Sequence, residues 1–369
     1  MLRLAWWAAI TLLIVESCAN KPVASLEAAG SFVITLPDEV LRLHKFYRVV
    51  PLSTEESNSS RQMIAVCGLG SSWIWLYRIE FPLAQDSLCL DSTGAFKIDL
   101  VYYDRYEKSL YLTGHNDRRV YRLSRDLEIL SVDTLGELRD NGGVEYFLGT
   151  GMSVGKDVLY FSVGANTDVD SFLIRPCLAA YDLKFKRWRF LHRHPIEIQK
   201  DAKRTFWYPL LASFDITTST QYHRFQFSDS VYSTSSEGIV KPKVHSKPVG
   251  VDFHRPYPAS TSSTWDLEVT EPRITFYEYL PKISAHVSVL VCGQSPRMPD
   301  GRLATDGTSE KMLIVSRHNK TTALPLPRNI RLYSPSPSVI GDQIMFARDS
   351  DSDRQAGRAT FTTYRLRLN

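Results

Sequence analysis

Three short runs decide the fold: Ser109-Leu110-Tyr111-Leu112-Thr113, Val120-Tyr121-Arg122-Leu123 and Leu127-Glu128-Ile129-Leu130-Ser131-Val132. A polar stretch separates the first two runs, and a Ser124-Arg125-Asp126 turn separates the last two. Apolar and polar residues alternate within each run. Alternation over about four to eight positions between turn residues is typical of half-buried antiparallel strands. The segment is therefore predicted to be a meander of three strands.

The first of these runs has counterparts along the whole chain, at Gln62–Cys67, Val158–Val163, Ser230–Ser233, His286–Val291 and Gln343–Ala347. The copies are spaced by roughly 45 to 70 residues, near the period of about 40 to 50 residues that is typical of propeller blades. No stretch of comparable length carries a clean helical period. The pattern predicts an all-β propeller of about six blades, with seven as an alternative.

The two ends of the chain are predicted to close this ring. The last hairpin, which ends at Leu368, is one strand short of a full blade, and Ser31–Leu36 has the composition of a strand. Closing the ring would remove two exposed sheet edges. We therefore expect Phe32–Leu36 to pair with a strand within Thr360–Leu368. Two β-sandwich domains, joined by the Pro/Ser-rich Lys247–Thr264, are the alternative.

Composition narrows the class of protein. The 369 residues are 43% apolar and 23% charged, which is near the average of globular domains. The 18 Tyr, 17 Phe and 7 Trp suit strands better than helices. The net charge is +4, and no basic run or basic-aromatic stripe stands out, so nucleic acid is not expected as a partner.

The N-terminus has the features of an export leader. Arg3 precedes the apolar run Leu4–Val15, which is too short to span a bilayer but fits a secretory signal. Val15-Glu16-Ser17-Cys18 follows and resembles the lipobox of bacterial lipoproteins. We expect a signal peptide over 1–17, a tether over 18–30 and a propeller domain over 31–369. The chain is then exported and lipid-anchored through Cys18 at the outer membrane or cell surface; an ordinary signal peptide is the alternative.

Three features together resemble a family of surface-type bacterial lipoproteins. They are the leader with Cys18, the hairpin from Tyr103-Asp104 to Leu123, and the segment from Phe225 to Tyr232 with the following His245-Ser246-Lys247. That family has propeller-like folds and no assigned function. The resemblance implies a fold and a membrane location, and it supplies no catalytic residues.

No catalytic, metal or cofactor motif is predicted. The internal cysteines, Cys67, Cys89, Cys177 and Cys292, form no CxxC pair, and Cys67 and Cys292 end apolar runs that suit core positions. The alternating Asp349, Asp351 and Asp353 lack the Gly and Glu of a calcium loop and are expected in a solvated turn. His192 and His194 flank Arg193 on a predicted outer strand and are expected at the surface.

Phe206-Trp207-Tyr208 is the candidate ligand-binding cluster. Its rings would stack on a sugar or peptide if they lay at the mouth of the ring, although structural packing is the favoured interpretation of the cluster. The predicted function is a membrane-anchored binding or interaction module with a carbohydrate or protein partner and no catalysis. The alternative is a polysaccharide- or peptide-processing enzyme with carboxylates in the propeller channel.

Overall fold

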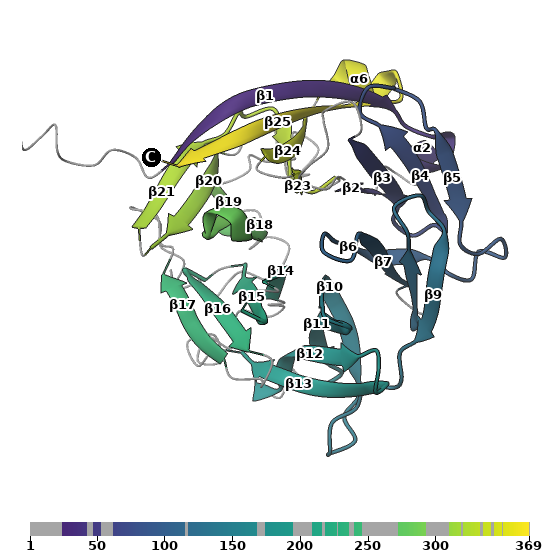
Figure 1. Ribbon diagram of the computed structural model, residues 1–369, viewed down its shortest axis with the longest axis vertical. Coiled ribbons are helices and arrows are strands. Elements are labelled where there is room, and N and C mark those ends of the chain that lie inside the picture. The colour runs from purple at the N-terminus through teal and green to yellow at the C-terminus, as the bar shows by residue number, and fades with distance from the viewer. Residues whose placement is uncertain are drawn as a thin grey trace, which may run out of the picture.

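The computed structural model describes residues 24–42, 47–52, 62–114, 117–167, 174–194, 209–215, 218–226, 228–235, 240–245, 272–292, 310–318, 320–332, 335–340, 343–348 and 350–368. These residues form a ring of β-sheets (Figure 1). Within these ranges, no helix is long and apolar enough to cross a membrane.

Five consecutive segments each form a four-stranded antiparallel sheet, here called a blade, with its first strand near the centre of the ring and its fourth at the rim (Figure 1). Blade 1 contains β2 (Tyr47–Pro51), β3 (Met63–Gly68), β4 (Trp73–Arg78) and β5 (Asp86–Cys89). Blade 2 contains β6 (Ile98–Asp104), β7 (Ser109–Gly114), β8 (Arg119–Leu123) and β9 (Ile129–Thr134). Blade 3 contains β10 (Tyr146–Gly155), β11 (Val158–Ala165), β12 (Pro176–Asp182) and β13 (Arg187–Arg193).

The other two blades follow the same order. Blade 4 contains β14 (Pro209–Asp215), β15 (Thr220–Phe225), β16 (Ser230–Ser235) and β17 (Val240–His245). Blade 5 contains β18 (Arg273–Leu280), β19 (Ala285–Cys292), β20 (Glu310–Arg317) and β21 (Lys320–Pro325). The short helices are α2 (Asp38–Arg42), η2 (Pro281–Ile283) and α6 (Asp351–Gln355).

A further sheet, here called the closing sheet, joins the two ends of the chain. Its strands are β22 (Ile330–Arg331), β23 (Ser338–Ile340), β24 (Gln343–Arg348), β25 (Arg358–Leu368) and β1 (Ala24–Thr35). Both β22 and β23 pair with β24, so two short strands share the inner position that one strand fills in a blade. The predicted count of about six blades is therefore corrected to five regular blades plus this sheet. The Pro-rich inner segment does not provide one continuous strand there.

The predicted closure of the ring is confirmed. β1 and β25 pair antiparallel, with Phe32 opposite Phe361 and Val33 opposite Thr360. The two phenylalanine rings stack with their centroids 5.2 Å apart. Because both ends of the chain share one sheet, the alternative of two separate sandwiches is wrong. The strand also begins earlier than expected, since Ala24 already pairs with Leu368; residues 24–30 belong to β1 and not to a tether.

Apolar side chains fill most of the described junctions between neighbouring sheets. Large buried clusters lie between blade 5 and the closing sheet, between the closing sheet and blade 1, between blades 1 and 2, and between blades 2 and 3. The side chains of β14 and β17 lie almost entirely outside the described residues. Among the described side chains of blade 4, those of β15 and β16 contribute to a smaller apolar cluster against blade 5 and include buried polar groups.

Two local predictions need correction. Ser230–Ser233 lies in β16, the third strand of its blade, and the second strand is the polar β15 that the repeat search missed. Asp351 and Asp353 lie in helix α6, where the Asp353 carboxylate accepts a hydrogen bond from Thr360 Oγ1 at 2.6 Å; they are not in an open turn. Cys67 is fully buried as expected, and Cys292 is partly exposed.

Candidate functional site

The central channel is the one described cavity where inner strands from several blades converge. It encloses about 200 Å³, and its walls come from β2, β6, β10, β18 and the segment that leads into β23. Three charged side chains, Arg48, Arg105 and Glu278, line it beside the hydroxyl groups of Tyr102, Thr275 and Ser336. The exposed surface of the walls is therefore more polar than apolar, with charged and hydroxyl groups among the apolar side chains.

Arg48 lies near one mouth of the channel. It follows the first residue of β2, and its Nη1 donates a hydrogen bond of 2.8 Å to Ser336 Oγ of the closing sheet. Burial lowers the pKa of Arg48, and the negative charge of Asp99, near the start of β6, opposes that shift. The guanidinium stays charged at neutral pH because arginine begins from such a high pKa.

Arg105 and Glu278 lie toward the other mouth. Tyr103 Oη, near the end of β6, donates 3.1 Å to the carbonyl of Leu52, just beyond the end of β2, so these inner strands run in the same direction. Arg105 follows the last residue of β6, and Glu278 is near the end of β18. Arg105 Nη2 and Glu278 Oε1 are 3.7 Å apart, which is an ion pair without a close hydrogen bond.

The channel is better suited to holding an anion than to hydrolysing a glycosidic bond. Among its described lining residues, Glu278 is the one carboxylate, and it already faces Arg105. A glycosidase needs two carboxyl groups about 5 to 10 Å apart on either side of the bond. A guanidinium group at either mouth can instead bind a carboxylate or phosphate through paired hydrogen bonds.

A second polar cluster lies between blades 3 and 4. His192 Nδ1 of β13 is 3.0 Å from His223 Nε2 of β15, and the rings of Phe225 and Tyr232 pack around them. His194 is 3% exposed and packs on Phe225. Burial lowers the pKa of His192 and His194 from 6.5 to about 4, and it lowers the pKa of His223 well below its usual value. The outer-strand position of His192 is confirmed, but the expectation of surface histidines is wrong, because blade 4 covers them.

The opposite face of β15 carries a buried arginine. Arg224 donates to the Ser228 carbonyl from Nε at 3.2 Å and from Nη2 at 3.0 Å, and its Nη1 donates 2.8 Å to Ser288 Oγ of blade 5. Nearby, the Tyr277 hydroxyl is 2.8 Å from His286 Nδ1. Arg224 thus joins blade 4 to blade 5, whereas the contact between Tyr277 and His286 lies within blade 5. Tyr277 also lines the channel. The channel wall is thus connected to this polar junction.

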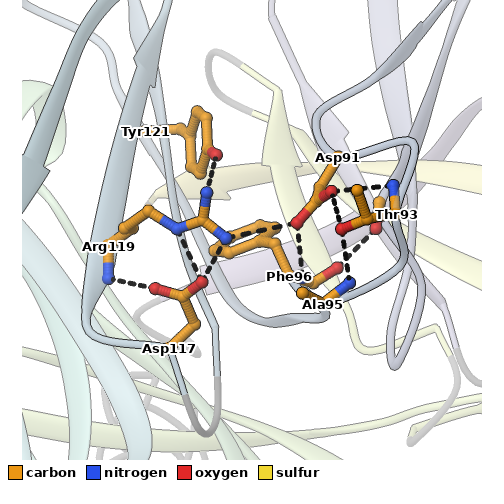
Figure 2. A network of polar contacts seen from close by, with 8 residues as sticks. Asp91, Thr93, Ala95, Phe96, Asp117, Arg119 and Tyr121 are labelled. Carbon is orange, nitrogen blue, oxygen red and sulfur yellow. Dashed lines mark hydrogen bonds and ion pairs between the residues drawn. The ribbon is translucent and has the colours of Figure 1, made fainter.

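A third network lies where the linker after β5 meets β8 (Figure 2). Asp91 accepts hydrogen bonds from the backbone amides of Thr93 and Phe96, at 2.9 Å each, and from Arg119 Nη2 at 3.2 Å. Arg119 also pairs with Asp117 and donates 3.1 Å to the Tyr121 hydroxyl. The hydrogen bonds from Thr93, Phe96 and Arg119 lower the pKa of Asp91. The charged groups contact one another, so this network fixes the linker against blade 2.

The sequence-predicted site residues lie outside the described residues: Cys18 and the cluster Phe206, Trp207 and Tyr208. Among the described residues, no three His, Cys, Asp or Glu side chains are grouped so as to hold a metal ion. Sequence reasoning missed Arg48, Arg105 and Glu278. They are single residues on separate strands, and no spacing in the chain connects them until the ring closes.

Comparison with known proteins identifies the fold. No protein-family model matches the chain, and no curated protein matches it. A crystal structure of a member of the DUF4221 family from Bacteroides vulgatus aligns with a TM-score of 0.68 at 12% identity, over 95% of this chain and 100% of that one.

Two further structures are more distant. A putative exported protein from Bacteroides fragilis aligns with a TM-score of 0.47 at 10% identity, over 88% of this chain and 95% of that one. A protein of unknown function from Bacteroides thetaiotaomicron has the same TM-score of 0.47 at 10% identity, over 88% of this chain and 70% of that one. At such identities a likeness concerns the fold alone. The chain therefore shares the all-β propeller-like fold of the DUF4221 protein.

Proposed function

We propose that this chain is a non-enzymatic binding protein of the bacterial envelope that takes a small anionic ligand into its central channel. The observation that carries the proposal is the placement of Arg48 and Arg105 on the wall of one cavity of about 200 Å³. The cavity volume limits the ligand to a small molecule. The 3.7 Å gap between Arg105 and Glu278 leaves the arginine able to turn toward a bound carboxylate.

Titration calorimetry on the full-length protein tests this site. The probes are glutarate, inorganic phosphate and D-galacturonate, with the neutral sugar D-galactose as the matched control. We expect at least one anion to bind. Arg48→Gln or Arg105→Gln, whichever arginine lies at the occupied mouth, should weaken the binding of that anion by about tenfold or more, since it removes a charge-assisted contact. The control is Arg118→Gln, which removes an arginine that pairs with Glu145 away from the channel and should leave the affinity for the anion unchanged.

A turnover assay tests the enzymatic alternative separately. Chromogenic glycosides and peptide substrates should show no turnover above the level of a Glu278→Gln variant, because the described channel wall carries no second carboxylate. If none of the three anions binds, or if galactose binds as tightly as galacturonate, the channel proposal is wrong. Turnover that Glu278→Gln abolishes would establish the enzyme alternative in its place.

The envelope location rests on the leader and on Cys18. Several acyl chains on one cysteine stabilise membrane association by about 0.8 kcal/mol per buried methylene, enough to anchor the propeller firmly. Expressed in a bacterium that processes lipoproteins, the wild-type chain should require detergent for release, and Cys18→Ala should be soluble or retain its leader. A Cys18→Ala protein that is processed and still needs detergent would contradict lipid anchoring.

A further inference from the structure

The hairpin between β12 and β13 carries the sequence Lys184-Phe185-Lys186-Arg187-Trp188-Arg189 at the rim of blade 3. Phe185 is 61% exposed at the turn, and Lys184 and Arg187 lie over its ring, 5.5 Å and 5.1 Å from the centroid. Lys186 is paired with Asp133 of blade 2. The hairpin therefore presents cations and an aromatic ring to solvent.

Unlike Lys186, Arg187 and Arg189 have no acidic partner among the described residues. Both are exposed, and neither forms an ion pair with a described residue. They line a cleft of about 330 Å³ whose floor includes Val158 and Ala180. The carboxylate in that lining is Asp182, and it accepts hydrogen bonds from the turn amides of Lys184 and Phe185 at 3.0 and 2.9 Å.

The strand that carries the two arginines is also an open edge. Among the described strands, β13 pairs with β12 on one side and is the last strand of its sheet, and no described residue pairs with its other edge, which can accept an added strand. Arg187 and Arg189 are two residues apart, so they project from one face with a spacing of about 7 Å. Acidic side chains at alternate positions of an extended peptide have the same spacing.

We propose that β13 is a docking edge for an extended acidic segment of a partner protein, in which alternate Asp or Glu side chains pair with Arg187 and Arg189. Backbone pairing supplies affinity and the two guanidinium groups select the acidic partner. The acidic segment matches β13 both in charge and in the spacing of its side chains. It is independent of the anion proposed for the channel, which lies at the centre of the ring.

Two other occupants fit less well. A second copy of this chain would place arginine opposite arginine along paired β13 edges, and like charges directly opposite one another destabilise a sheet. A membrane would have to reach this rim, yet β1, which follows the proposed lipid anchor, begins on the far side of the ring from β13 (Figure 1). Only the argument against a membrane depends on the proposed lipid anchor.

Fluorescence anisotropy with a labelled heptapeptide of alternating glutamate and valine tests the docking edge. We expect it to bind the full-length protein with an affinity that falls as salt is added. Its lysine-valine analogue should not bind, and a peptide of the same composition with its glutamates in one block should bind more weakly. Arg187→Glu with Arg189→Glu should weaken binding by about tenfold or more, and the milder Arg187→Gln with Arg189→Gln should weaken it by less.

The matched control is Lys97→Glu with Lys282→Glu, which changes the net charge equally at two exposed sites away from β13 and should alter affinity by less than about twofold. No binding of the alternating peptide at millimolar concentration would overturn the proposal. Equal affinity in the charge-reversed and control proteins would also overturn it. If polygalacturonate or phosphatidylglycerol vesicles bind in an arginine-dependent way and the peptide does not, the partner is a polysaccharide or a membrane and not a protein. That result would also overturn the proposal.

Discussion

The closing sheet and β15 of blade 4 both carry buried side chains, but the described contacts of those side chains differ in kind. Around the closing sheet, Ile34, Phe346 and Phe361 are buried in continuous apolar clusters. In β15 of blade 4, His223 and Arg224 are equally buried and contact polar groups of the neighbouring blades. Apolar burial is non-directional and insensitive to pH, whereas buried polar groups stabilise a fold only while each keeps its partner. The ring therefore has one robust junction and one conditional junction.

The largest expected effect is at the closing sheet. Phe361→Ala should reduce the free energy of unfolding by about 3 to 5 kcal/mol, because it removes a buried ring and leaves a cavity beside Phe32. Equilibrium urea unfolding measures the loss. Val33→Ala on the neighbouring position of β1 is the control: Val33 is 37% exposed, so its change should be below about 1 kcal/mol. Similar losses in the two variants would show that the closing sheet is not tightly packed.

The next effect is a loss of stability in acid at the blade 3–4 junction. The pKa of His192 and His194 is lowered from 6.5 to about 4 by burial, so the unfolded chain binds more protons than the folded chain between those values. Stability is fully present above about pH 6.5 and declines as the pH falls toward 4. Each histidine contributes on the order of 3 kcal/mol to that decline. Thermal unfolding across this range measures it.

The matched variants are His194→Leu and His318→Asn. The first removes a buried titrating group and should flatten the dependence of stability on pH, while His318 is exposed and its replacement should leave the slope unchanged. Asparagine suits position 318 because the residue has a positive φ of 47°. If stability is flat from pH 7 to 4.5 in the wild-type protein, the histidine cluster is not buried as described.

A smaller effect is expected at Arg224. Lysine at this position retains a charge but cannot donate to both the Ser228 carbonyl and Ser288 Oγ, so Arg224→Lys should cost about 1 to 3 kcal/mol. Burial lowers the pKa of Arg224 to about 10, so the wild-type side chain is charged at neutral pH. Arg367→Lys on the exposed pair with Glu27 is the control and should cost less than about 0.5 kcal/mol. Equal costs would mean that the buried contacts of Arg224 contribute nothing.

The smallest effect is expected at the rim network of Figure 2. Asp91→Asn should lower the thermal midpoint by no more than a few degrees. The amide oxygen can still accept the hydrogen bond from Thr93, but the NH2 group in place of Oδ2 loses the hydrogen bond from Phe96 and the attraction to Arg119. The loss should shrink at 0.5 M salt, which screens exposed pairs. A large, salt-independent loss would show that Asp91 organises the whole linker.

The sequence predicted the parts of the fold that depend on local pattern. Alternating apolar residues identified the second strands of most blades and the pairing of β1 with β25. The alternation pattern did not identify β15, because the sequence Thr220-Gln221-Tyr222-His223-Arg224-Phe225 carries few apolar residues and is nevertheless buried. Such a strand is recognisable only from the partners that satisfy its polar groups, and those partners come from other blades. The same polarity explains why His192 and His194 were expected at the surface.

The candidate site was less predictable than the fold. Arg48, Arg105 and Glu278 converge because the ring brings the inner strands together, and local sequence carries no signal of that convergence. The number of regular blades was also unpredictable, because no sequence pattern shows that two short strands, β22 and β23, take the place of one inner strand in the closing sheet. Local periodicity thus predicts strands, and long-range geometry determines which side chains meet.

Hydrogen–deuterium exchange followed by mass spectrometry tests the central contrast most directly. The amides of β25 and those of β15 should be compared in one protein at pH 7.5 and at pH 5, after correction for the intrinsic effect of pH on exchange. We expect β25 to keep the same protection at both values and β15 to lose protection at pH 5, because protonation of buried histidines opens the junctions of blade 4 first. Equal loss of protection in β15 and β25, or loss in β25 first, would contradict the account.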